Sequence, residues 1–328
     1  MVKLLHGLGY EVASLGGYID PSHPHDSKRP ALPDVPCHEV VKTAVDEQDT
    51  PDNLGAAQAN IPDAILEWLG ATGVIIFHHY LERLFGQWEH LREWRAAGGR
   101  VIWRTGGQST TDNEVRAVPF REEGLEIVRY SPKEHGIPGF AGEDALIRFY
   151  KEPDEWCDWA GTGEFVANIT QSLLRRHPWT NAEFYLQATE GLLAYPAGPE
   201  SEQLPGGLGV LSYEYMQQYL RDARCYLYTG TQPASYTLGL LEALMTGVPT
   251  VSIGPECMTI FPYGPDLFEG ADLCKPFSTS DPHTARGWLA AMLQKPEVAA
   301  QVSQHTRHRA MLEFGVEPVG KAWKAYLG

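Results

Sequence analysis

Short apolar stretches alternate with segments of helical periodicity along most of this chain. In its first part, β-branched and aromatic residues gather in short runs bounded by polar or glycine positions, which predicts buried strands. The runs cover residues 73–77, 100–103, 125–130 and 146–150. Helical spacing at 81–97 separates the first two runs, and this alternation is typical of a parallel α/β sheet.

The beginning of the chain departs from this order. Helical spacing at 2–8 comes first, a strand is predicted at 12–15, and further helical segments follow at 40–46 and 61–69. An α/β domain normally begins with a strand. We therefore expect the first strand of the N-terminal domain to be missing.

The alternation resumes after an interruption at 151–164, where Pro, Gly and Trp residues break the periodicity. Such a segment predicts a linker between two domains, one at 1–150 and one beginning at 165. The second domain has predicted strands at 165–169, 192–195, 225–228 and 248–253, a helical run that ends at 177, and helices at 212–223, 286–293, 297–313 and 318–327.

The stretch 225–255 combines two of these strands with the helix between them. Ser235 is a good N-cap, and helical spacing follows it until Gly247 and Pro249 end the helix. In an open α/β sheet, ligands bind where a strand leads into such a helix. The backbone N–H groups of Tyr236, Thr237 and Leu238 would favour a phosphate there.

Glu242 is the single charge in a run of Leu, Ala and Met on this helix. It lies about 10 Å along the axis from Ser235, at ~1.5 Å per residue. A nucleoside diphosphate along the helix would place its phosphates at the N-terminus and its ribose at Glu242. The alternative is that Glu242 faces solvent or pairs with a nearby arginine.

Polar residues also follow two strands of the first domain. His78 and His79 follow the strand at 73–77, and Arg104, Gly106 and Gly107 follow the strand at 100–103. Because parallel strands end at one edge of a sheet, these residues predict ligand-facing loops. Alternatively, the histidines cap a helix and Arg104 pairs with a carboxylate.

Composition narrows the function. The 328 residues are 43% hydrophobic with a formal net charge of −16, which predicts packed domains and disfavours a large nucleic-acid footprint. Five cysteines without close spacing indicate a reducing cytoplasm. No apolar run reaches the ~20 residues of a membrane span. The spacing of His23, His25 and Asp26 fits no standard metal site.

The segment SYTLGLLEALMTGVPTVSIG resembles the signature helix of the retaining nucleotide-sugar glycosyltransferases of group 1. Glu242-Ala243 and Gly247-Val248-Pro249 match that signature, whereas Ala234 stands where the family has its first glutamate. The resemblance implies the GT-B fold, in which two Rossmann-like domains face each other across a cleft. Residues 1–150 would form the acceptor domain, braced by a C-terminal helix at 315–328, and residues 165–314 the donor domain.

The same resemblance implies roles for single residues. Glu242 would bind the donor ribose. The run FVANITQSLLRR resembles the family's first donor-domain strand and the basic residues after it, so Arg175 or Arg176 would bind the diphosphate. A solvated arginine pair at a helix end is the alternative. His78 or His79 would correspond to a histidine that the family places after its fourth strand.

We therefore expect a glycosyltransferase that moves a hexose or related sugar from a nucleotide sugar, with UDP as the nucleotide. The acceptor would bind in the interdomain cleft and the anomeric configuration would be retained. The sequence contains no Asp-x-Asp motif, so arginines and a helix terminus, rather than a metal, would neutralise the diphosphate. The predicted donor site comprises Arg104, Gly106, Gly107, Arg175, Arg176, Thr231, Ser235, Tyr236, Thr237, Leu238 and Glu242.

The acceptor stays open. Small phage glycosyltransferases with a similar motif modify hydroxymethylated pyrimidines in DNA, and this chain resembles them in style. Such an acceptor would require a basic groove, formed by Arg100, Arg104, Arg116, Arg121 and Arg129. Two other functions remain: a nucleotide-sugar binding protein without activity, for which Ala234 argues, and a UDP-sugar epimerase of the same fold.

Overall fold

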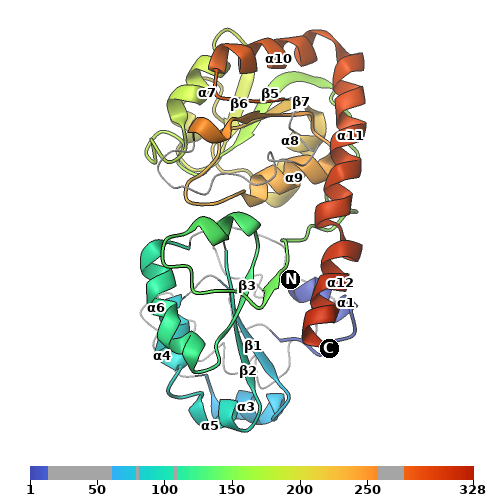
Figure 1. Cartoon of the computed structure of the whole chain (residues 1–328). Coiled ribbons are helices and arrows are strands. Elements are labelled where there is room, and N and C mark those ends of the chain that lie inside the picture. The colour runs from blue at the N-terminus through green and yellow to red at the C-terminus, as the bar shows by residue number, and fades with distance from the viewer. Residues whose placement is uncertain (14–60, 79–80, 107–108, 258–276) are drawn as a thin grey trace. The chain divides into compact units, whose positions relative to one another are not determined.

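The computed structural model describes residues 1–13, 61–78, 81–106, 109–257 and 277–328. The chain divides into two compact units (Figure 1). Unit 1 comprises Met1–Tyr130, Pro138–Ile147 and Gly320–Gly328, and unit 2 comprises Ser131–Ile137 and Arg148–Val319.

Among the described residues, unit 1 holds a four-stranded parallel sheet in the order β1-β2-β3-β4. Its strands are β1 (Val74–His78), β2 (Arg100–Arg104), β3 (Glu126–Arg129) and β4 (Ala145–Leu146). The apolar runs at the first three positions thus form the predicted strands. The predicted strand at 146–150 is wrong in extent. The last backbone hydrogen bond to β3 runs from the Ile147 N–H to the Arg129 carbonyl, directly after β4.

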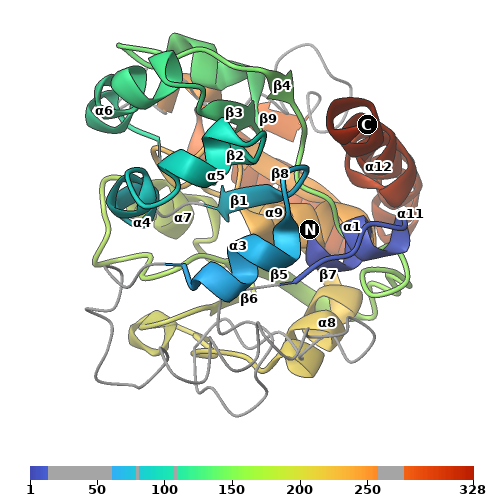
Figure 2. The same ribbon diagram turned by 90° about the horizontal axis from the view of Figure 1, so that it is seen from below.

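Helices surround this sheet (Figure 2). They are α1 (Val2–Gly7), α3 (Asp63–Leu69), α4 (Leu81–Gln87), α5 (Arg92–Ala96) and α6 (Thr111–Glu122). The single helix predicted at 81–97 is divided into α4 and α5. The break between them buries Trp88 and Leu91 together, and Trp88 Nε1 donates to Glu123 Oε2 at 2.7 Å. Tertiary packing of a large indole therefore outweighs the local helical periodicity.

The helix α12 (Val316–Leu327) begins in unit 2 and continues into unit 1. It lies beside α1 in Figures 1 and 2, and Gly320 faces Leu4 and Leu8 so closely that an added Cβ would lie 3.2 Å from Leu8. Tyr326 near its end donates to Glu126 of β3. The expected strand at 12–15 shows no regular structure at residues 12 and 13, and its remainder and the helix at 40–46 fall outside the described residues.

Unit 2 holds, in its described part, a five-stranded parallel sheet in the order β6-β5-β7-β8-β9. The strands are β5 (Gly163–Ile169), β6 (Ala194–Ala197), β7 (Ala223–Tyr228), β8 (Thr250–Ile253) and β9 (Ser278–Thr279). Along the chain, β5 is followed by β6, which lies on one side of it, and then by β7, which lies on its other side. The strand order therefore reverses between β5 and β7, which makes their carboxyl ends a topological switch point.

Helices cover both faces of this sheet. They are α7 (Ala182–Ala188), α8 (Tyr213–Asp222), α9 (Leu238–Thr246), α10 (Pro282–Gln294) and α11 (Pro296–Phe314). Alternate apolar residues of β5, β7 and β8 pack with α7 and α10, while α9 packs with α8 and α11 (Figure 1). Because α9 is buried from Leu240 to Thr246, its sequence is mostly apolar on all sides rather than amphipathic.

The segment after β5 differs from the prediction. Residues 171–180 form turns, so the helical run expected to end at 177 is wrong. Ser172 adopts a left-handed conformation with φ of 51°, which a continuous α-helix excludes, and helix α7 begins only after Asn181. The basic residues of this segment therefore lie on a loop at the carboxyl end of β5.

Candidate functional site

The candidate site begins at the switch point of unit 2, where the loops after β5 and β7 diverge. Asn168, one residue before the end of β5, donates from Nδ2 to the Leu227 carbonyl at 2.9 Å. Its Oδ1 and the Oγ1 of Thr229, directly after β7, are buried and have no hydrogen-bond partner within the described part of the chain. Two unpartnered buried polar atoms at one sheet edge are unusual and indicate a place where a polar molecule binds.

The loop after β7 turns before it enters α9. Ala234 N–H donates to the Thr231 carbonyl at 2.8 Å, which closes a tight turn. The predicted N-cap at Ser235 is therefore wrong, because the turn delays the helix by two residues. Thr237 is the N-cap instead, and its Oγ1 accepts from Leu240 N at 3.3 Å.

This shift changes which backbone groups face the switch point. Ser235 and Tyr236 precede the helix and are buried. Tyr236 Oη accepts from Phe149 N at 3.4 Å. The first-turn N–H groups belong to residues 238–240. Gly239 lies against the end of β5, where an added Cβ would lie 3.2 Å from the Ile169 side chain. The positive end of the α9 dipole thus opens beside β5.

Glu242 lies in the second turn of α9 and is buried. Its carboxylate forms an ion pair with Lys151 Nζ, and each side chain is only 5% exposed. The possibility that Glu242 faces solvent is therefore wrong, and the cation beside it is a lysine, not an arginine. This lysine comes from the segment that the sequence analysis treats as a linker.

Tyr226 of β7 lies close enough to Glu242 to be affected by its charge. Burial raises the pKa of the Tyr226 phenol far above its usual value, and the Glu242 carboxylate raises that pKa further. The phenol therefore stays neutral. Its Oη is 3.3 Å from both the Ile169 nitrogen and the Ile169 carbonyl oxygen, which joins the end of β5 to β7.

The two predicted diphosphate ligands, Arg175 and Arg176, lie on the loop after β5. Arg175 is 71% exposed, and its guanidinium donates to Glu200 Oε2 and to Ser172 Oγ, each at 3.1 Å. The side chain of Arg176 forms no ion pair with any described residue. Neither arginine is at a helix end, since residues 171–180 form turns.

The predicted site residues of unit 1 meet at the carboxyl ends of β1 and β2. His78 is exposed at the end of β1 and stands opposite Arg104 in the ladder. Arg104 is buried, with its Nη2 donating to the Ile147 carbonyl at 2.5 Å and its Nη1 to the Thr105 carbonyl at 3.3 Å. Gly106 follows, whereas His79 and Gly107 lie outside the described residues.

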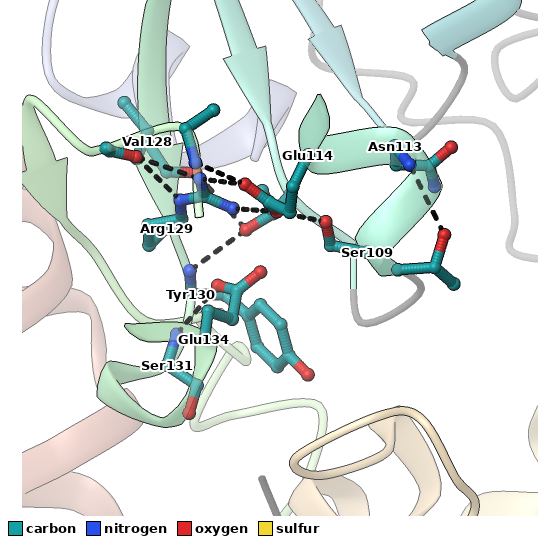
Figure 3. A network of polar contacts seen from close by, with 12 residues as sticks. Ser109, Asn113, Glu114, Val128, Arg129, Tyr130, Ser131 and Glu134 are labelled. Atoms are coloured by element: carbon teal, nitrogen blue, oxygen red, sulfur yellow. Dashed lines mark hydrogen bonds and ion pairs between the residues drawn. The ribbon is translucent and has the colours of Figure 1, made fainter. Parts of the chain in front are cut away.

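A second buried ion pair lies close to this edge (Figure 3). Arg129 holds both oxygens of Glu114, with Nη1 to Oε1 at 2.6 Å and Nη2 to Oε2 at 2.7 Å, and neither side chain is exposed. Glu114 also accepts from Ser109 Oγ and from Ala141 N. This network joins α6 to β3 and to the segment before β4.

The five arginines that a DNA acceptor would require do not form an exposed basic surface. Arg129 and Arg104 are buried. The other three pair with carboxylates: Arg100 with Glu126, Arg116 with Asp112 and Arg121 with Asp144. Of the five, Arg116 alone has a side chain more than a third exposed, and one such arginine does not make the basic groove that a DNA backbone needs.

Among the described residues, no group of three or more His, Cys, Asp or Glu side chains could hold a metal ion, and His23, His25 and Asp26 lie outside them. Within the same residues, each helix is too short or too polar to cross a membrane.

No protein-family model matches the chain, and no curated protein matches it. Several solved structures, however, match the chain in fold. Anabaena HepE in complex with UDP-glucose has a TM-score of 0.61 at 12% identity, over 88% of each chain. A glycosyltransferase from Rickettsia africae has a TM-score of 0.59 at 10% identity, over 88% of this chain and 87% of that one. A Thermobaculum terrenum O-GlcNAc transferase variant has a TM-score of 0.51 at 15% identity, over 81% of this chain and 56% of that one.

At these identities the likeness shows the fold. The chain has the two-domain α/β architecture with parallel sheets that glycosyltransferases of the GT-B type share, and the predicted fold class is confirmed. The particular activity is a separate question, which depends on the residues of the site.

Sequence reasoning missed Lys151, Asn168 and Thr229 as site residues. Asn168 is the single amide in the apolar strand 165–169, and this interruption was the signal for it. Lys151 could have been sought as the cation that a buried carboxylate requires. Thr229 had no signal of its own, because a threonine after a strand is typical of any loop.

Proposed function

We propose that this chain is a glycosyltransferase that takes its sugar from a nucleotide diphosphate sugar, with UDP as the nucleotide. The observation that carries the proposal is the position of Glu242, a buried carboxylate in the second turn of a helix that opens at the switch point. The likeness in fold to a protein crystallised with UDP-glucose, over 88% of each chain, supports a nucleotide-sugar donor.

The donor would lie along α9. Its diphosphate would bind the first-turn N–H groups of Leu238 and Gly239, where the helix dipole favours negative charge, while the Leu240 N–H donates to the Thr237 cap. Glu242 is four residues from Leu238, about 6 Å along the axis, so the ribose hydroxyls would reach its carboxylate. Asn168 Oδ1 and Thr229 Oγ1 would find partners in the donor.

The chemistry would depend on stabilising the departing nucleoside diphosphate. Negative charge develops on its phosphates as the bond to the sugar breaks, and fixed positive groups lower the barrier to that step. Arg175 and Arg176 on the loop after β5, together with the α9 N-terminus, would supply this charge. Arg175 would exchange its exposed contact with Glu200 for a phosphate, which costs little because exposed ion pairs are weak.

We further propose that unit 1 binds the acceptor at the carboxyl ends of β1 and β2, with His78 as a contact. The transferred group would be a hexose, with retained configuration. A hydroxymethylated pyrimidine in DNA finds no support in the arginines of unit 1, so the acceptor is proposed only as a hydroxyl compound.

Incubation with UDP-, GDP- and ADP-sugars tests the proposal. Release of one nucleotide, strongest with a UDP-sugar, is expected. Thermal stabilisation by the nucleotide sugar without release of nucleotide would instead favour a binding protein, which the Ala234 position also suggests. If no nucleotide sugar stabilises the chain or is consumed, the proposal is wrong.

The double variant Arg175→Ala/Arg176→Ala tests the catalytic assignment. We expect kcat to fall at least about 100-fold, comparable to the loss of a group that stabilises charge in the transition state. Arg286→Ala is the matched control, because Arg286 is also a surface arginine of unit 2 with a carboxylate partner, Glu190 at 2.7 Å. Turnover of the double variant at the wild-type rate would contradict the assignment.

A further inference from the structure

The ion pair between Lys151 and Glu242 has more support from its surroundings than a surface pair would have. Both side chains are 5% exposed. The Lys151 backbone N–H donates to the Phe314 carbonyl at 3.1 Å, and its Nζ lies 5.2 Å from the centre of the buried Trp156 ring. Backbone and side chain are therefore held independently, so the ammonium group has a fixed position beside α9.

Burial means that the Glu242 carboxylate needs a partner to compensate the loss of water. The neighbouring residues on α9, such as Leu241, Ala243 and Met245, are apolar and fully buried, so their side chains offer it no polar group. The Lys151 ammonium, paired with Glu242, supplies this compensation and fixes the direction in which the carboxylate points.

A carboxylate with a fixed orientation is a better acceptor for a sugar hydroxyl than one that is free to turn. Hydrogen bonds to a charged group are roughly twice as strong as those between neutral groups, and they weaken when they are poorly aligned. The orientation that Lys151 imposes on Glu242 thus bears directly on ribose binding.

We propose that Lys151 is a positioning residue for the donor nucleotide, which holds the Glu242 carboxylate oriented to accept a hydrogen bond from the ribose. This inference rests on the proposed function, since it assigns the ribose to Glu242. Lys151 itself does not touch the reacting atoms. Its contribution is expected in donor affinity and in discrimination between ribose and deoxyribose, with little effect on kcat.

The competing explanation is that the pair only attaches the segment 148–157 to α9. Arg307 of α11 offers a matched control for that role. Its Nη1 donates to the Trp156 carbonyl at 2.7 Å and to the Met245 carbonyl at the end of α9, so it joins the same segment to the same helix. It forms no ion pair with Glu242 in the described structure. Arg307→Met should lower stability and leave ribose discrimination unchanged.

The experiment measures the affinities of UDP, 2′-deoxy-UDP and 3′-deoxy-UDP by calorimetry at 10 °C, with the folding of each variant verified by circular dichroism. Wild-type protein is expected to bind UDP about 10- to 100-fold more tightly than at least one deoxy analogue, because a hydrogen bond to a charged group is lost. In Lys151→Met, UDP should bind as weakly as that analogue, and the affinity of the analogue should change less than threefold. Lys151→Arg, which keeps the charge, should retain most of the discrimination.

Each other outcome has a definite meaning. If Lys151→Met fails to fold, Lys151→Gln takes its place with the same expectation, because its shorter and uncharged side chain removes the ion pair but keeps a polar group in the buried position. Full wild-type discrimination in a folded Lys151→Met or Lys151→Gln overturns the inference and leaves the proposed function intact. Wild-type binding of UDP without ribose discrimination overturns it as well. Failure of the wild type to bind UDP, GDP or ADP overturns the proposed function.

Discussion

Replacing Arg129 with methionine removes one member of a fully buried ion pair without opening a large cavity. Methionine keeps a long side chain of similar reach but leaves the Glu114 carboxylate without its cation (Figure 3). The Gly142 carbonyl also loses two donors, Arg129 Nη2 at 2.8 Å and Nε at 3.1 Å. Glu114 retains the hydrogen bonds from Ser109 and Ala141.

The expected magnitude follows from burial. Removing one partner of a buried pair typically costs about 3–5 kcal/mol, because the remaining charge is uncompensated. The two retained donors lower this cost, while the carbonyl left without partners adds to it by about 1–3 kcal/mol. We therefore expect unit 1 to lose about 3–5 kcal/mol. For a domain of 150–250 residues, this loss corresponds to a melting temperature about 6–20 °C lower.

Urea unfolding followed by tryptophan fluorescence measures this loss. Trp103 is buried in unit 1, and the Arg129 guanidinium carbon lies 5.2 Å from its ring centre, so the summed emission of the nine tryptophans includes a signal from the affected region. The double variant Glu114→Gln/Arg129→Met should recover about 2 kcal/mol or more, because it removes the uncompensated charge. Arg92→Met is the control, since Arg92 forms an exposed pair with Glu89 in the same unit and should change stability by less than ~0.5 kcal/mol.

Two results would contradict this account of the Arg129–Glu114 pair. One is a loss below about 1 kcal/mol in Arg129→Met, because a buried carboxylate without a cation cannot be so easily accommodated. The other is a double variant that is no more stable than the single variant, since the destabilisation would then come from lost packing.

Three further predictions concern other parts of the chain. Thr229→Val should leave the stability of the nucleotide-free protein unchanged or raise it by up to ~1–3 kcal/mol, because the buried Oγ1 has no partner among the described residues. Thermal unfolding with and without UDP measures this change, and a loss of stability above ~1 kcal/mol contradicts the prediction. Burial raises the pKa of Glu126, but its bonds to Arg100 and Tyr326 outweigh burial, so the net pKa is below the ordinary 4.5. The stability that ionised Glu126 contributes is thus present above pH 4.5 and is lost as the pH falls through the lowered pKa. Urea unfolding from pH 7 to 3 measures the difference in free energy of unfolding between wild type and Glu126→Gln, which should shrink only at the acid end. Gly207→Ala should destabilise unit 2 by about 1–3 kcal/mol, because an added Cβ would lie 1.7 Å from the Ser201 carbonyl oxygen, whereas Gly287→Ala in α10, with nothing within 4 Å, should raise the melting temperature.

The sequence pattern alone determined the parallel α/β organisation and most of the strands. Buried parallel strands are short, apolar and separated by helical segments, so their signal is local and can be read directly. The same local pattern singled out Glu242 as a lone charge between apolar residues on a helix, but it left open whether that side chain is buried or faces solvent.

Only the tertiary structure decided which groups meet those residues. Lys151 is 91 positions from Glu242 in the sequence, and no periodic pattern relates the two. The N-cap moved from Ser235 to Thr237 because a tight turn precedes the helix, and the helical run before 177 was replaced by turns around the left-handed Ser172. Periodicity records which face of an element is buried, whereas ion pairs, caps and turns depend on what the rest of the chain brings to that face.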